Sequence, residues 1–137
     1  MLEQVLLIAG ALIFGALGSI HLLYTFVGER FSPRDPATRA AMEATSLRLT
    51  RATTMWRAWI GFNASHSLGA MVFAAFVLLL AGWHMDFLRS APLFAWLAAI
   101  NALAWLALAA RYWFRIPLIG LALSSACFVL AALRLSF

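Results

Sequence analysis

The chain has 137 residues, of which 65% are hydrophobic and only 11% are charged, and its formal net charge is +5. Soluble domains are about half apolar and about a quarter charged, so this composition excludes an ordinary soluble protein and indicates a single integral membrane domain, residues 1–137. All ten basic residues are arginines that lie mostly beside apolar segments, a pattern explained by membrane topology and lipid headgroups, and we expect no nucleic-acid partner.

Four apolar segments are each long enough to cross a membrane. They cover about residues 5–27, 55–81, 92–110 and 116–133. A spanning helix needs roughly 20 apolar residues, whereas a spanning strand is shorter and alternates between apolar and polar residues. The sequence therefore predicts an all-α membrane protein, a four-transmembrane-helix antiparallel bundle with a partly helical cytoplasmic first loop.

The first loop, Gly28–Thr54, contains a helix start at Asp35, because an aspartate before proline is a typical N-cap and Pro36 suits the first helical position. No helix breaker follows, so we expect the segment after Asp35 to be mostly helical. It is either a short surface helix or an extension of the second span. It is interpreted as a solvated helix at the lipid headgroups, with a lid over a site as the alternative.

The arginines are distributed unequally between the two sides of the predicted bundle. The first and third loops, with the first turn of the second span, carry eight: Arg30, Arg34, Arg39, Arg48, Arg51, Arg57, Arg111 and Arg115. The second loop and the C-terminal segment carry the other two, Arg89 and Arg134. The positive-inside rule then places both termini on the non-cytoplasmic side. We expect a bacterial inner membrane; in a eukaryotic endomembrane the termini would face the lumen.

Polar side chains recur at a similar depth in all four predicted spans. They are His21 in the first, Asn63 and His66 in the second, Asn101 in the third, and Ser124 and Ser125 in the fourth. Counted from the cytoplasmic ends at 1.5 Å per residue, they fall within about 8 Å of one depth. Because polar groups in hydrocarbon are costly, we expect this polar layer to face the bundle interior.

Small residues at four-residue spacing let two helix backbones approach closely. Two such rows occur: Ala11, Gly15 and Ser19 in the first span, and Gly61, Ser65 and Gly69 in the second. We expect these rows to pack together, which would bring His21 towards Asn63 and His66.

Three interpretations of the polar layer remain open. The polar groups can be hydrogen-bonding contacts between helices, which is the expected role of the serines. His21 or His66 can act as a base or hydrogen-bond donor in a small-molecule site, with Asn63 orienting it. The two histidines can also ligate a haem or a metal. No acidic residue lies within a span core, which argues against a carboxylate-rich metal centre, and no cofactor-binding motif is present.

A second group of residues is expected at the cytoplasmic mouth: Arg57, Arg111, Tyr112 and Arg115. Arginines there can anchor the protein to lipid headgroups. The alternative is an anion site in which forked guanidinium groups hold a carboxylate or a phosphate.

The architecture resembles the MAPEG family of glutathione-dependent membrane enzymes, which share the chain length, four helices, lumenal termini and a long cytoplasmic first loop. The family's second helix carries an Arg-Ala…Asn…Glu pattern, which is loosely matched by Arg57-Ala58…Asn63…His66, with different spacing and histidine in place of glutamate. Arg111 and Tyr112 echo the end of its third helix. The resemblance implies a homo-oligomer that binds its ligand between subunits. The phrases "GSIHLLYTF" and "RYWFRIP" are also similar to small bacterial four-helix membrane proteins of uncharacterised family.

The function expected from the sequence is binding of a lipophilic small molecule at an intramembrane polar site, in a membrane protein that is either an enzyme or a binding protein. One alternative is a structural or accessory subunit of a membrane complex without chemistry of its own. The other is a haem- or metal-binding membrane protein. The expected partners are the lipid bilayer, a lipophilic small molecule and further copies of the chain.

Overall fold

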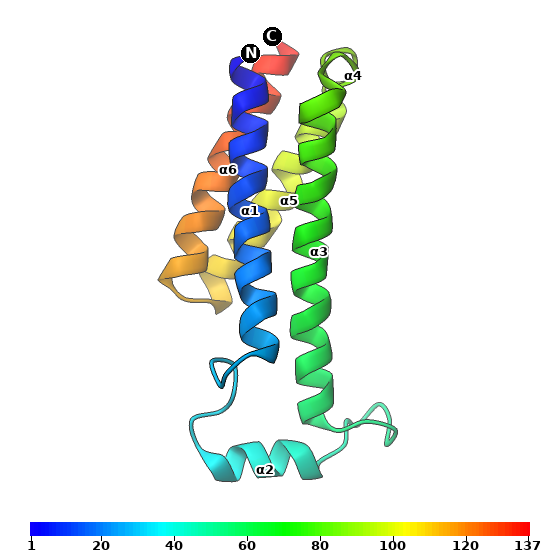
Figure 1. Ribbon diagram of the computed structural model, residues 1–137, viewed down its shortest axis with the longest axis vertical. Helices are drawn as coiled ribbons and strands as arrows, with labels where there is room; N and C mark the ends of the chain where they lie inside the picture. Colours follow the sequence, from blue (N-terminus) through cyan, green and yellow to red (C-terminus); the bar gives the residue numbers. More distant parts are fainter. The chain divides into compact units, whose positions relative to one another are not determined.

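The computed structural model describes all 137 residues, is 81% helical and contains no β-strand (Figure 1). Its helices are α1 (Leu2–Phe26), α2 (Pro36–Ala44), α3 (Met55–Trp83), α4 (Met85–Ser90), α5 (Leu93–Tyr112) and α6 (Arg115–Ser136). Four of them, α1, α3, α5 and α6, are long and apolar enough to cross a membrane. The all-α fold and the four candidate spans are confirmed, with boundaries within a few residues of those expected.

The sequence did not predict α4, a short helix between α3 and α5. Met85 and Leu88 are buried on one face of this helix, while Asp86 and Arg89 form an ion pair of 2.9 Å on the exposed face. Met85 and Leu88, like Asp86 and Arg89, are three residues apart, a spacing typical of a helix. The pattern covers only six residues, so it does not stand out between two long apolar segments.

Asp35 is the N-cap of α2, as predicted, with Pro36 at the start of the helix. The Thr38 hydroxyl donates to the Asp35 carboxylate at 2.7 Å, and the backbone amides of Ala37 and Thr38 donate at 3.1 and 3.0 Å. These bonds favour the ionised carboxylate and hold the Asp35 pKa below its ordinary value.

The loop is partly helical, as expected, but the prediction that it is mostly helical after Asp35 was wrong. Helix α2 ends at Ala44, Thr45 is extended, and Ser46 pairs with Thr54 in an isolated antiparallel bridge. The cause is the run of serine and threonine residues, whose hydroxyls compete for backbone amides. Thr50 Oγ1, for example, accepts from the amide of Ala52 at 3.1 Å. The structure therefore contains a short helix, not an extension of the second span.

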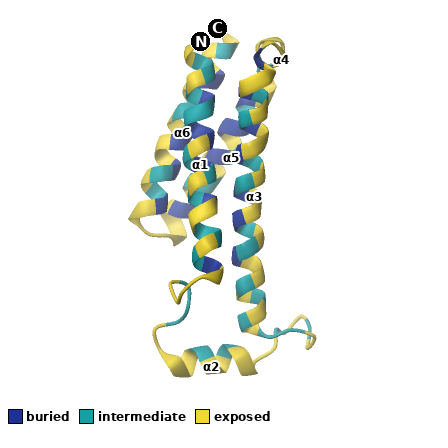
Figure 2. Cartoon of the chain, viewed as in Figure 1, coloured by how far each residue is buried: buried dark blue, intermediate teal, exposed yellow.

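Two compact units make up the chain, and α1 and α3 each contribute to both. The first unit comprises Met1–Leu17 and Ala70–Phe137, and the second comprises Gly18–Gly69. The buried residues of the long helices follow stripes along them, whereas α2 has no buried residue (Figure 2).

The first unit is packed through small side chains and a few rings. Its buried alanines lie on all four long helices: Ala11, Ala70, Ala74, Ala81, Ala95, Ala98, Ala99, Ala102, Ala109, Ala131 and Ala132. The ring of Phe14 meets those of Phe73 and Trp105 edge-on, at centroid distances of 4.9 and 5.1 Å. Helix α6 is fixed to α1 by a hydrogen bond of 2.8 Å from Ser124 Oγ to the carbonyl of Gly10.

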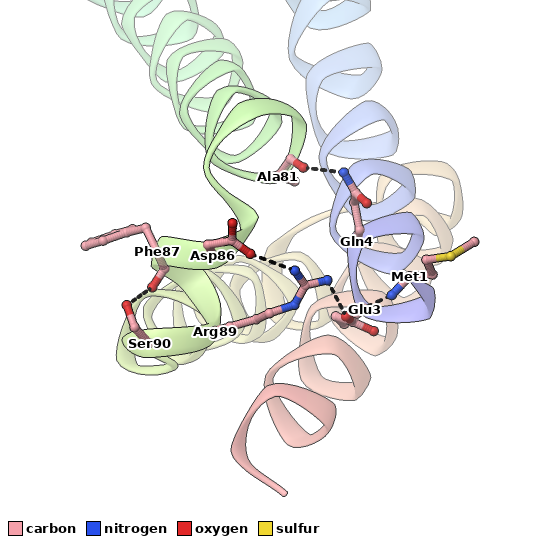
Figure 3. Close-up of polar contacts among 8 residues, drawn as sticks. All are labelled: Met1, Glu3, Gln4, Ala81, Asp86, Phe87, Arg89 and Ser90. Carbon is pink, nitrogen blue, oxygen red and sulfur yellow. Dashed lines mark hydrogen bonds and ion pairs between the residues drawn. The ribbon is translucent and has the colours of Figure 1, made fainter.

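Polar contacts join α1, α3 and α4 at the end of the first unit where the two chain termini lie (Figures 1 and 3). The guanidinium of Arg89 bonds to Glu3 at 3.2 Å, and the side-chain amide of Gln4 donates to the carbonyl of Ala81 at 2.8 Å. The bond to Glu3 and the bond to Asp86 raise the pKa of Arg89. The N-terminus, the C-terminus and α4 therefore share one end of this unit.

Candidate functional site

The polar residues predicted to converge lie on the buried faces of α1 and α3. On α3, buried positions recur at alternating spacings of four and three residues: Asn63, Ser67, Ala70, Ala74, Val77 and Ala81. On α1 the same spacing runs through Leu7, Ala11, Phe14, Gly18, His21 and Thr25, of which only His21 is half-buried instead of buried. This spacing keeps side chains on one face of a helix. His21 and Asn63 thus belong to these stripes, together with the hydroxyl residues Thr25 and Ser67.

The small-residue row on α3 does not form the predicted contact. Gly61, Ser65 and Gly69 are exposed, and a Cβ atom added to either glycine would meet nothing within 4 Å. On α1, Gly15 does make a close approach, because a Cβ added there would lie 3.0 Å from the Cβ of Ala74. The packing face of α3 is therefore the alanine row, which allows close approach as glycine would.

Asn63 and His21 form the central hydrogen bond of the second unit. Asn63 Oδ1 lies 3.0 Å from His21 Nε2, and Asn63 Nδ2 donates to the carbonyl of Trp59 at 2.8 Å. The bond to Trp59 fixes the amide, because turning it over would place its oxygen against another oxygen. Asn63 Oδ1 must then be the acceptor, and His21 carries a proton on Nε2.

His66 is the second imidazole of the cluster and is half-buried, like His21. The two ring centroids are 5.3 Å apart and the rings are tilted by 55°. Phe62, one turn earlier on α3, stacks on His66 at 6.0 Å and 23°. The sequence predicted that His21, Asn63 and His66 would lie together. In the structure His21 contacts both of the other two, Asn63 through a hydrogen bond and His66 through its ring.

Phe31, from the loop after α1, packs against His21 of this cluster. Its ring lies 4.5 Å from the ring of His21, tilted by 36°, and its backbone carbonyl accepts a hydrogen bond of 3.0 Å from Trp59 Nε1. The chain turns back after α1 through Gly28, whose φ of 82° is one that other residues rarely adopt. Sequence reasoning missed Phe31, although a large apolar residue in the polar stretch "GERFSPRDP" was an available signal.

Two cavities adjoin this loop, and Phe31 and Ser32 line both. One has a volume of about 290 Å³ and is bounded also by Tyr24, Arg39 and Trp56. The other has a volume of about 440 Å³, and its further lining residues are Arg30, Pro33, Met42 and Trp59. Space for a small molecule is therefore present around Phe31 and Ser32, whereas His21, Asn63 and His66 line neither cavity.

Arg39 ties α2 to its neighbours around the smaller cavity. Its guanidinium lies 3.7 Å from the ring centroid of Trp56, its Nε pairs with Glu43 at 2.7 Å, and its Nη1 donates to Ser32 Oγ at 3.0 Å. Arg30 lies in the same way over Tyr24, at 4.2 Å. Stacked guanidinium groups fix the loop without burying an unpaired charge.

The other predicted site residues are not part of this cluster. Asn101 is half-buried on α5, in the first unit, so its membership of the polar layer stays a prediction. Arg57 is exposed in the second unit, whereas Arg111, Tyr112 and Arg115 are exposed in the first. Arg111 lies 5.5 Å over Tyr112. The proposed anion site at these residues stays a prediction.

A metal centre would have to be built from His21 and His66 alone. No group of three or more histidine, cysteine, aspartate or glutamate residues is arranged to hold a metal ion. The two imidazoles are already in ring contact, and Nε2 of His21 is directed at Asn63. This donor set is suited to hydrogen bonding with an organic group.

No family model, curated protein or solved structure matches this chain. The likeness to the MAPEG enzymes therefore rests on the number of apolar helices and the long first loop, with no match of sequence or structure to support it. Any functional conclusion has to be drawn from the geometry of the site.

Proposed function

We propose that this chain is an integral membrane protein that binds a lipophilic small molecule at the His21–Asn63–His66 cluster. The observation that carries the proposal is the arrangement of Asn63, whose amide is fixed by one helix carbonyl and in turn fixes the ring of His21. A contact that only joined two helices would need one donor and one acceptor. Here a second imidazole and the ring of Phe31 also pack against His21, and Phe31 in turn lines two cavities.

The same proposal places the four long helices as an antiparallel bundle across the membrane. Contacts within the first unit support it: Ser124 meets Gly10 and Gly120 approaches Leu17, so α6 runs opposite to α1. Trp96 at the start of α5 donates to Ser136 at the end of α6, at 3.1 Å. The arginine distribution favours termini on the non-cytoplasmic side of a bacterial inner membrane.

The proposed chemistry is hydrogen bonding to a polar group of the ligand, with proton transfer if the protein is an enzyme. Imidazole can donate from one nitrogen and accept at the other, and it is the side chain best matched to proton transfer near neutral pH. Asn63 acts as the positioning residue, because it selects the His21 tautomer. A ligand that enters from the bilayer would bring its polar group to this level.

The haem alternative fits the geometry less well. A porphyrin held by two histidines lies between their rings, whereas the rings of His21 and His66 are separated by only 5.3 Å between centroids. Binding would require the helices to separate and the His21–Asn63 bond to break.

Native mass spectrometry of the purified protein tests the binding proposal. A bound lipophile is expected in the wild type and in Ser65→Ala, a control on the exposed face of α3, and it should be lost in Asn63→Ala and His66→Ala. If several mild detergents yield protein without any bound mass, the proposal fails. The accessory-subunit alternative would gain if that protein also migrated only with other membrane proteins.

Cysteine labelling tests the orientation. In a Cys127→Ala background, Ser46→Cys in the first loop should react only from the cytoplasmic side, and Ser90→Cys in α4 only from the opposite side. Labelling of the Ser46→Cys variant by an impermeant reagent in intact cells would overturn the proposed orientation.

A further inference from the structure

We infer that Phe31 fills a slot over His21 that the ligand's own ring occupies, so that the ligand class is a lipophile whose flat, uncharged ring carries a hydroxyl or a carbonyl group. This inference rests on the proposed function of the His21–Asn63–His66 cluster, and it adds the chemical class of the ligand.

The surroundings of the Phe31 side chain are those of a bound aromatic ring. His21 lies against it at 4.5 Å with a tilt of 36°, and Tyr24 meets it nearly edge-on at 6.5 Å and 63°. The ring of Phe31 therefore has a close tilted ring contact on one side and an edge contact on another, and both are contacts that flat aromatic rings make. A puckered saturated ring is thicker and makes neither contact, so the slot discriminates by planarity.

The Phe31 ring can leave this slot without unfolding the loop. The loop backbone is held by the hydrogen bond from Trp59 to the Phe31 carbonyl, and by Arg39 at the hydroxyl of Ser32. Neither bond involves the phenyl ring. Rotation about the side-chain bonds of Phe31 therefore exchanges the ring for a ligand while both backbone attachments stay in place.

The cavity volumes also indicate that a ligand ring needs the space that the Phe31 ring occupies. Phe31 lines both the 290 Å³ and the 440 Å³ cavity. Small-molecule pockets have volumes of about 300–1,000 Å³, so each cavity alone is at or below the middle of that range. Withdrawal of the phenyl ring adds its volume to the space over His21. A ring-bearing lipophile then has room for its ring, with its substituent at the imidazoles.

The charges around the slot favour an uncharged ring substituent. Two cations line the cavities: Arg39, at the smaller one, is paired with Glu43 and lies over Trp56, and Arg30, at the larger one, lies over Tyr24. The carboxylate of Glu29 lines the smaller cavity, so the charges of the two arginines and of Glu29 and Glu43 sum to zero. An acidic headgroup would meet that carboxylate and would have to compete for Arg39. A hydroxyl or carbonyl group needs only the donors and acceptors of the imidazoles.

A matched pair of probes tests the inference: para-octylphenol, with a flat ring, and para-octylcyclohexanol, with a puckered ring and the same chain and hydroxyl. Their dissociation constants are measured by titration calorimetry in detergent micelles for the wild type, Phe31→Ala and Phe31→Leu. Because a ring–ring contact no longer has to be broken, Phe31→Ala should bind para-octylphenol about two- to tenfold more tightly than the wild type does. It should gain less for para-octylcyclohexanol.

Phe31→Leu keeps the slot filled and should gain less affinity than Phe31→Ala. Weaker binding of the phenol to Phe31→Ala, with a melting temperature unchanged from the wild type, would overturn the inference, and so would equal gains for both probes. If those gains are equal but Asn63→Ala still abolishes binding, the proposed function stands without the ring-specific slot. If His66→Ala binds both probes as the wild type does, the ligand lies elsewhere and both proposals fail.

Discussion

Replacement of Asn63 by alanine tests whether the His21–Asn63 bond organises the site. Asn63 is only 5% exposed, and the change removes its bonds to both His21 and the Trp59 carbonyl. A buried group left without its partner costs about 1–3 kcal/mol. Hydrogen bonds between helices within a membrane are worth less, about 0.6 kcal/mol on average and about 1.7 at most. We therefore expect Asn63→Ala to lower the free energy of unfolding by about 1–2 kcal/mol.

The contribution of the bond itself comes from a double-mutant cycle with His21→Ala. Unfolding is followed by tryptophan fluorescence as the mole fraction of denaturing detergent rises. We expect a coupling energy of about 0.6–1.7 kcal/mol between the two changes. Asn101→Ala is the matched control, because it truncates a half-buried amide that makes no side-chain hydrogen bond in the structure. Additivity of His21→Ala and Asn63→Ala to within about 0.3 kcal/mol would refute the reasoning.

Three further predictions concern the rest of the fold. Ser124→Ala should destabilise the protein by about 1 kcal/mol, because it removes a hydrogen bond between α6 and α1. Ser125→Ala should not, because the buried hydroxyl of Ser125 has no partner; equal losses of stability in detergent unfolding would contradict this. Gly10→Ala should destabilise the protein, because the added Cβ would lie 2.9 Å from a ring carbon of Phe128 on α6. Gly61→Ala faces open space and should stabilise the protein by up to about 1 kcal/mol in the same unfolding assay. The pKa of Asp35 is lowered by a threonine hydroxyl and two backbone amides, so its stabilisation of α2 is complete above pH 3.8 and is lost as the pH falls through the lowered pKa. Because intrinsic amide exchange also slows as the pH falls, the readout is the protection of the α2 amides relative to an unfolded peptide, which should decrease there; a protection profile identical to that of Asp35→Ala would be the contrary result.

The sequence predicted that His21 and Asn63 lie near one another because the depth of a residue in a helix and the helix face it occupies both depend on nearby residues alone. The positions of His21 and Asn63 within two apolar segments determine how far each lies from the loop, and the cost of polar groups in hydrocarbon directs them to a packed face. The choice of packing row was wrong for α3, where alanines at 70, 74 and 81 replace the expected glycine row. Small residues permit close approach on any face that carries them, so their spacing alone does not identify the face that packs.

The loop was the harder part to predict. Its helix start at Asp35 is a local signal and was found, but the end at Ala44 depends on several hydroxyls that each compete weakly with helix. The position of Phe31 over His21 depends on contacts with residues of α1 and α3 that are distant in sequence from the loop. No periodic pattern within the loop encodes such contacts.

The guanidinium groups of Arg39 and Arg30, which lie over the rings of Trp56 and Tyr24, determine which reagents can disturb the first loop. A guanidinium keeps its charge throughout the range in which proteins stay folded, and its planar form suits an aromatic face in a way that a lysine ammonium does not. The chain contains no lysine at all. Reagents that acylate amines should therefore leave these two attachments intact.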